Sequence, residues 1–441
     1  MPSPRRPWFR LLLKEGRELL ASRAWWVLAV VVGPLVGVTF INAVRTYAEA
    51  SGLGGTATGV GSAFAPLDGI WAPTFAAYEI AAVFLLPFVA IRVFTSDRHS
   101  GALKLELQHR ISPPARIGAK ALVLLAGWGL ASVPALAAVG LWKSYGGSVH
   151  APEIACLALG HVLNALLTVG LAAAVASIAE NPSTAAILVL SFTVGTWILG
   201  FLASLRGGLW ALAARFAPEA MVDEFRRGLI SLATLLVTLI LIAAALAVAA
   251  LWVRLGASRR RRAVETAAVL GLAGVLAAAA ALVRPSWDVS EGRRNSFSRA
   301  DEAALARIPG PLRIEARLAP EDPRRSDLEH KALSKLRRAM PSVRIRYVSA
   351  TSIGLFEQAG SGYGEIRYEL GGRSAVNRLT TEDGVLETIY GLAGVSPPAD
   401  TEPPFPGHPL AAEPKGAAAI FFGLWPALAA GLAFVTLRRK T

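Results

Sequence analysis

Long apolar windows, separated by short polar segments, dominate the pattern of hydrophobic and polar positions along the chain. A bilayer core about 30 Å thick is crossed by about 20 helical residues, at roughly 1.5 Å of rise per residue. Eight windows reach this length, at residues 25–44, 71–94, 121–142, 154–178, 184–205, 228–253, 264–283 and 416–437. The sequence therefore predicts a polytopic α-helical membrane protein with about eight transmembrane helices.

The composition fits a membrane protein, and the position of the basic residues predicts its orientation. Of the 441 residues, 54% are hydrophobic and 17% are charged, whereas soluble domains contain about 25% charged residues. With the N-terminus in the cytoplasm, the inner segments carry 20 Lys and Arg residues and the three short outer loops carry six. Because basic loops stay cytoplasmic, we expect a multi-pass protein of the bacterial cytoplasmic (inner) membrane with both termini cytoplasmic. The net charge of +14 then reflects orientation, and no nucleic-acid partner is expected.

Residues 1–24 place polar and apolar positions at helical spacing before the first window. Trp8, Leu11, Leu12, Glu15 and Leu19 alternate with basic side chains. This pattern is typical of an amphipathic helix in the membrane interface, with its cations directed toward lipid phosphates. Membrane lipid is therefore an expected partner of this helix. The alternative is the frayed flank of a signal anchor.

Residues 284–415, between the seventh and eighth windows, have the pattern of an α/β domain. They carry 19 basic and 18 acidic residues. Ser298 is the expected N-cap of a helix, with Glu302 near its first turn. Alternation predicts strands at 312–318 and 343–348 and a hairpin at 364–379, and helical spacing predicts helices at 327–339 and 382–393. We expect one sheet covered by helices, in an extracytoplasmic domain between the seventh and eighth transmembrane helices.

The polar segment at residues 95–120 is the most specific stretch of the sequence. We expect a charged turn followed by a short amphipathic helix that begins at Gly101. This helix ends at Ser112, where a new helix begins. Its pattern combines an acidic–Arg pair, a Gly, spaced leucines, a Pro, a basic residue, and a Gly followed by a Lys. The residues that carry this pattern are Asp97, Arg98, Gly101, Leu103, Leu107, Pro113, Arg116, Gly118 and Lys120.

This pattern resembles the cytoplasmic loop of ABC transporter permeases of the type-2 exporter class, which carries the coupling helix that docks on an ATPase. The resemblance extends over about residues 8 to 255 and implies a six-span permease core at residues 25–255, and residues 216–230 resemble the outer re-entrant segment of the same family. It implies coupling to a separate ABC ATPase subunit, which would bind ATP and Mg, and a second permease copy or a related permease. Ala102 replaces the usual Thr and Lys104 a usual acidic residue. The residues alone leave open an ordinary cytoplasmic loop with helical character.

The domain after the seventh window resembles the auxiliary extracytoplasmic domain of gliding-motility-type ABC systems. Asp288, the Asn295–Ser298 string, and the strand from Gly364 with its Gly371-Gly372 turn carry this resemblance. It implies a binding or assembly role with an unknown partner.

The sequence offers no catalytic or metal-binding constellation. It contains no Gly-x-x-x-x-Gly-Lys-Ser/Thr string for nucleotide phosphates, and its six histidines show no ligand spacing. We therefore expect neither an enzyme nor a cofactor in this chain. The intramembrane polar residues are Glu79, His161 and Asn164. Glu79 is expected to line a substrate path, to bond a neighbouring helix or to lie near the outer interface; His161 and Asn164 form an interhelical contact or a ligand site.

Two functions remain open from the sequence. The first is the permease subunit of an ATP-driven exporter, which couples ATP hydrolysis by another chain to substrate movement. The second is a membrane-anchored structural or assembly component of an envelope or gliding-type machinery, without transport. ATP-dependent substrate movement would distinguish them.

Overall fold

The structure is a computed structural model. It describes residues 5–53, 64–99, 111–206, 208–214, 217–254, 256–319, 322–340, 342–348, 362–399 and 405–438. The chain divides into two compact units, which are described separately here. The first comprises Met1–Ile198, Arg215–Pro285 and Pro406–Thr441, and the second comprises Leu199–Ala214 and Ser286–Phe405.

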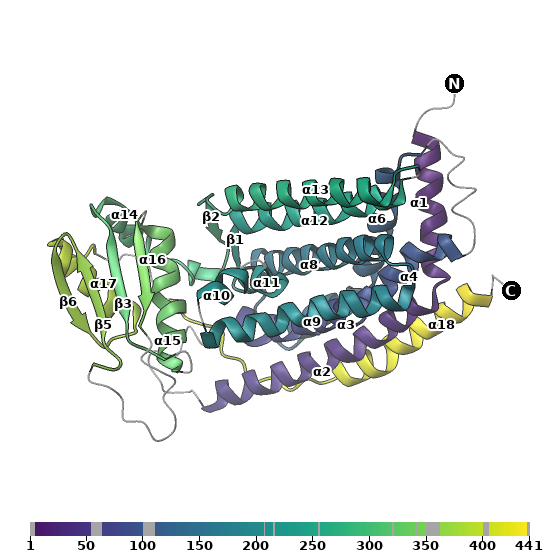
Figure 1. The fold of residues 1–441 in the computed structure, drawn as a ribbon. Coiled ribbons are helices and arrows are strands. Elements are labelled where there is room, and N and C mark those ends of the chain that lie inside the picture. Colours follow the sequence, from purple (N-terminus) through teal and green to yellow (C-terminus); the bar gives the residue numbers. More distant parts are fainter. Residues whose placement is uncertain are drawn as a thin grey trace, which may run out of the picture. The chain divides into compact units, whose positions relative to one another are not determined.

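Long helices make up the first unit (Figure 1). Eight helical stretches in the described residues are long and apolar enough to cross a membrane, by length and composition: Arg23–Gly52, Leu67–Ser96, Pro113–Ser144, Ala151–Ile178, Pro182–Gly200, Leu232–Val253, Arg259–Ala280 and Ala419–Arg438. They coincide with the eight apolar windows, so the prediction of a multi-pass helical membrane protein is confirmed at this level. The individual helices are α1 Arg5–Leu20, α2 Arg23–Leu53, α3 Ala72–Phe84, α4 Leu86–His99, α6 Pro113–Ala131, α7 Val133–Ser144, α8 Ala151–Ile178, α9 Pro182–Arg206, α11 Pro218–Arg226, α12 Leu232–Val253, α13 Arg259–Ala280 and α18 Trp425–Arg438.

The sixth apolar helix begins four residues later than its window predicts. Gly228 has a φ of +73°, which turns the chain at the end of α11. The short strand β1 (Leu229–Ser231) follows, and the hydroxyl of Ser231 caps α12 by accepting from Thr234 N. The apolar window thus includes a turn that hydrophobicity alone does not reveal.

The first and last apolar helices pack closely through small residues. The indole of Trp425 on α18 lies against Gly33 on α2, where an added Cβ would lie only 2.0 Å from its ring. The same indole donates to the backbone oxygen of Ala29 at 2.7 Å. The two helices run side by side in Figure 1. Gly33 on α2 therefore permits the last apolar helix to approach the first apolar helix.

The second unit is built on a four-stranded sheet. The strands are β3 Leu312–Ala316, β4 Val343–Tyr347, β5 Ile366–Leu370 and β6 Arg373–Asn377, in the order β4-β3-β5-β6. β3 and β4 are parallel, and the other pairs are antiparallel. Gly371 and Gly372 both have positive φ values, +56° and +82°, as a two-residue hairpin turn requires. The expected strands and hairpin are present.

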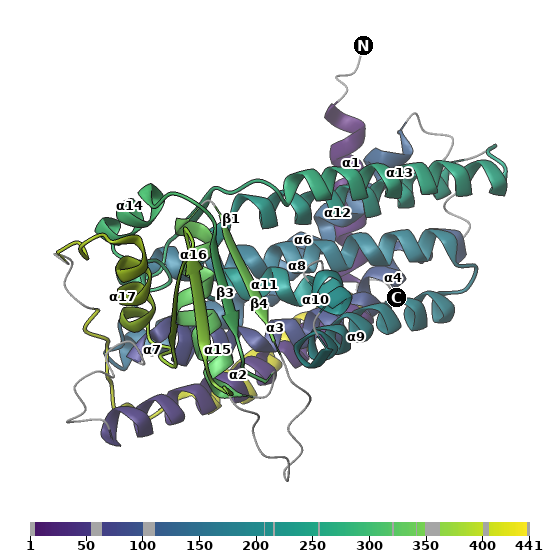
Figure 2. The ribbon, with the colours of Figure 1, turned by 60° about the vertical axis from the view of Figure 1, so that its left-hand side comes forward.

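Helices pack on one face of this sheet (Figure 2). They are α14 Arg299–Arg307, α15 Pro323–Leu328, α16 Ser334–Ala339 and α17 Glu382–Ala393. Their apolar side chains share one core with Ile314 and Tyr368, while the alternate strand residues, such as Arg313 and Arg367, are exposed. This alternation gives the sheet one face that packs on the core and one face that is exposed.

Two helix starts in the second unit show what the sequence pattern did and did not reveal. Ser298 is the N-cap of α14, as expected, and accepts from Asp301 N at 3.1 Å. Asp322 starts the next helical stretch at Pro323, four residues before the predicted 327, because it accepts from Arg324 N at 2.9 Å. Hydrogen bonds from the Arg324 side chain lower the pKa of Asp322 to about 2.

Candidate coupling site

The predicted coupling loop connects α4 to α6, and the structure describes its two ends. Asp97 and Arg98 belong to the last turn of α4, which ends at His99. Pro113 is the first residue of α6, where its missing N–H leaves no helical bond unmade. Gly101, Leu103 and Leu107 lie outside the described residues.

A buried ion pair joins the start of α6 to the N-terminal helix. The ammonium of Lys120 lies 2.7 Å from a carboxylate oxygen of Glu15 on α1, and these side chains are 8% and 1% exposed. Lys120 also donates to the backbone oxygen of Val93 on α4, at 3.2 Å. Because removing one member of a buried pair leaves an uncompensated charge, this contact holds three helices together at the two ends of the loop.

Arg116 and Lys120 point into the molecule and not toward solvent. They are 5% and 6% exposed, while Pro113 and Gly118 are half-buried. The resemblance implies contact with an ATPase along the whole loop, but a soluble partner cannot reach these two buried cations in this structure. Their geometry instead suits them to hold α6 in place beneath the loop.

A second close contact, at Gly127, joins α6 to α1 and α2. Gly127 on α6 lies under the side chains of Leu19 and Trp25, so that an added Cβ would lie 2.7 Å from Leu19 and 2.8 Å from the indole of Trp25. Trp26, the next residue, donates to the backbone oxygen of Leu20 at 2.6 Å and so fixes the bend between α1 and α2. The amphipathic helix, the first apolar helix and α6 therefore form one packed joint.

The sequence contained a partial signal for this joint. Glu15 falls on the apolar side of the predicted interfacial helix, at one turn from Leu11 and Leu19. A carboxylate on an apolar face calls for a buried cation. Its partner, 105 positions away in Lys120, could not be identified from spacing.

The three polar residues that the sequence places within apolar windows lie on two helices. Glu79 is on α3, and His161 and Asn164 are on α8. The ring of His161 lies 5.3 Å from that of Phe75 and 6.3 Å from that of Tyr78, between ring centroids. The two α8 residues therefore do not share one contact: His161 packs against α3, whereas Asn164 faces a cavity beneath α11.

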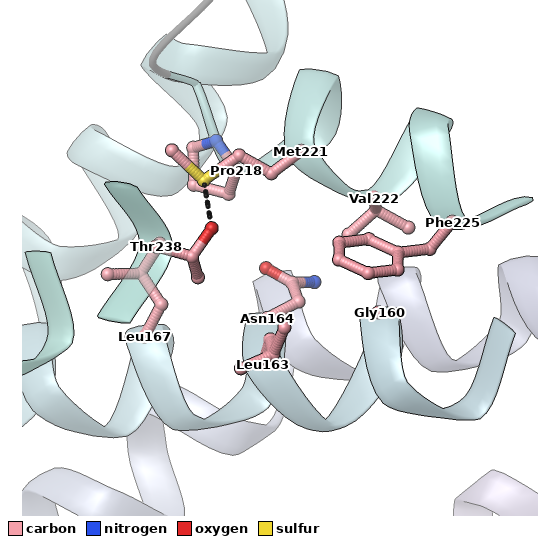
Figure 3. A pocket seen from close by; sticks show the side chains of 9 residues that line it. All are labelled: Gly160, Leu163, Asn164, Leu167, Pro218, Met221, Val222, Phe225 and Thr238. Atoms are coloured by element: carbon pink, nitrogen blue, oxygen red, sulfur yellow. Dashed lines mark hydrogen bonds between the residues drawn. The ribbon is translucent and has the colours of Figure 1, made fainter. Parts of the chain in front are cut away.

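This cavity is small and largely apolar (Figure 3). It lies between α8, α11 and α12, and Asn164 projects from α8 into it alongside Phe225 of α11. Thr238 of α12 donates to the sulfur of Met221 at 3.2 Å across its far side. Its lining residues are Gly160, Leu163, Asn164, Leu167, Pro218, Met221, Val222, Phe225 and Thr238.

Arg226 is a site residue that the sequence pattern missed. Its guanidinium lies 3.6 Å from the carboxylate of Glu79, so α11 is linked to α3. In the sequence it counts only as one of six basic residues in outer loops. Among the described residues, no group of three or more His, Cys, Asp or Glu could hold a metal ion.

No protein-family model, curated protein or solved structure matches the chain, so its residues and their geometry carry the functional argument.

Proposed function

We propose that the chain is the membrane-spanning permease subunit of an ATP-driven ABC transporter of the export class. A separate ABC ATPase subunit binds ATP and Mg, and this chain couples hydrolysis to substrate movement. A second permease copy, or a related permease, completes the pathway. The proposal places the protein in the bacterial cytoplasmic membrane with both termini cytoplasmic.

The observation that carries the proposal is the buried pair between Glu15 and Lys120. A loop that a soluble partner displaces must be bonded to the helices that move, because otherwise the loop would bend and the helices would stay in place. Here the loop that resembles a coupling loop leaves α4 and enters α6, and both ends meet α1 through Lys120. Gly127 and Trp25 extend the joint to the first apolar helix.

The mechanism follows from this joint. ATP binding closes the partner ATPase and displaces the loop between α4 and α6. Because a buried ion pair joins α1 to α6 and Lys120 also bonds to α4, these three helices move as one body, and α2 follows through the contact at Gly127. The displacement changes the opening between the two permease halves.

Residues 284–415 form an extracytoplasmic domain in this proposal, with a binding or assembly role. The alternation of basic loops supports this placement, since it leaves the N-terminus in the cytoplasm and seven apolar helices then carry the chain to the outer side. A cysteine at exposed Ser374 should react with an impermeant thiol reagent in intact cells, and one at exposed Arg260 should not. Both variants are made in Cys156→Ala, which removes the only native cysteine. The reverse labelling pattern would overturn the placement.

Purification of the tagged full chain from its native membrane tests the proposed partner. We expect an ABC ATPase with a Gly-x-x-x-x-Gly-Lys-Ser/Thr loop to co-purify, and Asp97→Lys/Arg98→Glu to reduce its recovery at least tenfold. The matched control is Arg259→Gln, which changes an exposed pair with Glu180. Recovery of envelope proteins without an ATPase would favour the structural or assembly role instead.

A further inference from the structure

Polar groups from three helices meet where α3, α8 and α11 pack together. The carboxylate of Glu79 lies 3.6 Å from the guanidinium of Arg226. His161 is 4% exposed and packs on Phe75, which lies one turn before Glu79 on the same side of α3. Phe225, next to Arg226 in the chain, packs against Gly160, next to His161, so α11 meets α8 at this point. These three residues, far apart in the sequence, define one small polar site within the helical unit.

Each of the three residues keeps a buried polar atom that has no hydrogen-bond partner among the described residues. These atoms are Oε1 of Glu79, whose 3.6 Å ion pair with Arg226 is longer than a hydrogen bond, Nε of Arg226 and Nε2 of His161. A buried polar atom without a hydrogen bond costs about 1–3 kcal/mol, so three such atoms in one place favour a bound molecule that supplies hydrogen bonds to them. The carboxylate oxygen accepts, the guanidinium N–H donates, and the imidazole nitrogen does either according to its tautomer.

The charges around the site favour an uncharged ligand. Glu79 and Arg226 neutralise each other, and α11 also carries the carboxylates of Glu219 and Asp223, the latter paired with Arg227 at 2.6 Å. An anion would meet these carboxylates, and a cation would compete with Arg226. A buried charge without its own partner is costly. A hydroxyl group, which donates and accepts without charge, fits the free atoms.

The surroundings favour a ligand that also has an apolar part. Glu79 and His161 lie within Leu67–Ser96 and Ala151–Ile178, two of the helices apolar enough to cross a membrane. Beside them, Ile80 and Val162 are 45% and 38% exposed. An acyl chain would find apolar side chains to pack on next to the polar atoms.

We propose that Glu79, His161 and Arg226 form a binding site for the hydroxyl group of an uncharged, membrane-embedded amphiphile. Water is the other source of such a hydroxyl, and the two sources differ in whether an attached acyl chain adds affinity. The proposal does not depend on coupling to an ATPase, because binding is measured without ATP. Failure of this binding proposal would leave the coupling proposal intact, and failure of the coupling proposal would leave the binding proposal intact.

The test uses the full chain in phosphatidylcholine nanodiscs and native mass spectrometry. The probes are 1-oleoylglycerol, methyl oleate, which has the same chain without hydroxyls, and oleoyl lysophosphatidic acid, which adds a negative charge. We expect 1-oleoylglycerol to bind about tenfold or more tightly than methyl oleate, as one buried hydrogen bond predicts, and more tightly than the anionic probe. Equal affinity for the first two would assign the site to water alone, and tighter binding of lysophosphatidic acid would make it an anion site; either overturns the proposal.

Variants locate the binding. His161→Phe keeps the ring that packs on Phe75 but removes Nε2, and Arg226→Met removes the donor. Each should lower the affinity for 1-oleoylglycerol about tenfold and leave methyl oleate unchanged. Arg227→Met, at the next position in the chain, is the matched control and should stay within twofold of the wild type. Unchanged binding in both site variants would refute the location, and if they do not fold, the comparison of the three lipids on the wild-type chain still decides.

Discussion

Replacing Lys120 by Met tests the buried pair most simply, because it removes the charge and keeps most of the side chain's length. Glu15 loses its 2.7 Å partner while 1% exposed, and Val93 loses a 3.2 Å hydrogen bond. Breaking a buried pair in this way costs about 3–5 kcal/mol. Lys14, which lies 3.4 Å from the other Glu15 oxygen and is 34% exposed, offsets part of the loss. We expect a destabilisation of about 3 kcal/mol, or roughly a hundredfold in the opening equilibrium.

The chain's single cysteine supplies the assay. Cys156 is 2% exposed on α8, with its sulfur 3.5 Å from the backbone oxygen of Phe225. A thiol-reactive dye therefore labels it only after the helices open. The labelling rate of the full chain in detergent, at one temperature below the unfolding transition, should rise about a hundredfold in Lys120→Met. Circular dichroism on the same samples separates global unfolding from local opening near α11.

A double-mutant cycle completes the test. Glu15→Gln/Lys120→Met removes both charges and should label more slowly than Lys120→Met, because no uncompensated buried charge remains. Arg259→Gln is the control: its pair with Glu180 has side chains 84% and 78% exposed and should have almost no effect. A wild-type labelling rate in Lys120→Met would contradict the stabilising role of the buried pair. A double variant that loses as much stability as the Glu15→Gln and Lys120→Met variants together would contradict it as well.

Three further predictions use the same full-length protein. Gly127→Ala should raise Cys156 labelling, since the new Cβ would lie 2.7 Å from a side chain of α1, whereas Gly129→Ala, with no atom within 4 Å of its added Cβ, should not; equal effects would contradict the packing. Gly33→Leu should destabilise the wild-type protein more than it destabilises the Trp425→Ala variant, because removal of the indole leaves room for the leucine side chain. The same labelling assay measures both effects, and an equal loss of stability in the two backgrounds would count against the contact. Because the pKa of Asp322 is lowered to about 2, this carboxylate stabilises the second unit above about pH 4 and loses its effect as the pH falls toward 2. The stability of α15 measured by hydrogen exchange should therefore fall between pH 4 and pH 2 in the wild type, and should not change over this range in Asp322→Asn.

The periodic parts of the fold were accessible from sequence because they depend on local chemistry. Eight apolar stretches, the Ser298 cap and the hairpin at Gly371 each follow from neighbours within a few positions. Errors occurred where a short-range polar contact overrode the hydrophobic pattern. Gly228 and the cap at Ser231 delay α12, and Asp322 starts its helix early.

The sites were less accessible because their partners are distant in the chain. Glu15 could be recognised as a carboxylate on an apolar face, but not its pairing with Lys120. Glu79 stood out as an ionisable group within an apolar window, but its cation, Arg226, lies on a helix whose position depends on tertiary contacts such as the packing of Phe225 against Gly160. Sequence spacing constrains neighbours on one helix and says nothing about which helices meet.

The most direct test of the central claim is the ATP hydrolysis rate of the ABC ATPase that co-purifies with the chain, measured with the full chain in nanodiscs. We expect the wild-type chain to change this rate, and Asp97→Lys/Arg98→Glu to abolish the change while Cys156 labelling stays at the wild-type level. Absence of any bound ATPase, or an unchanged response with the reversed charges, would contradict the coupling proposal.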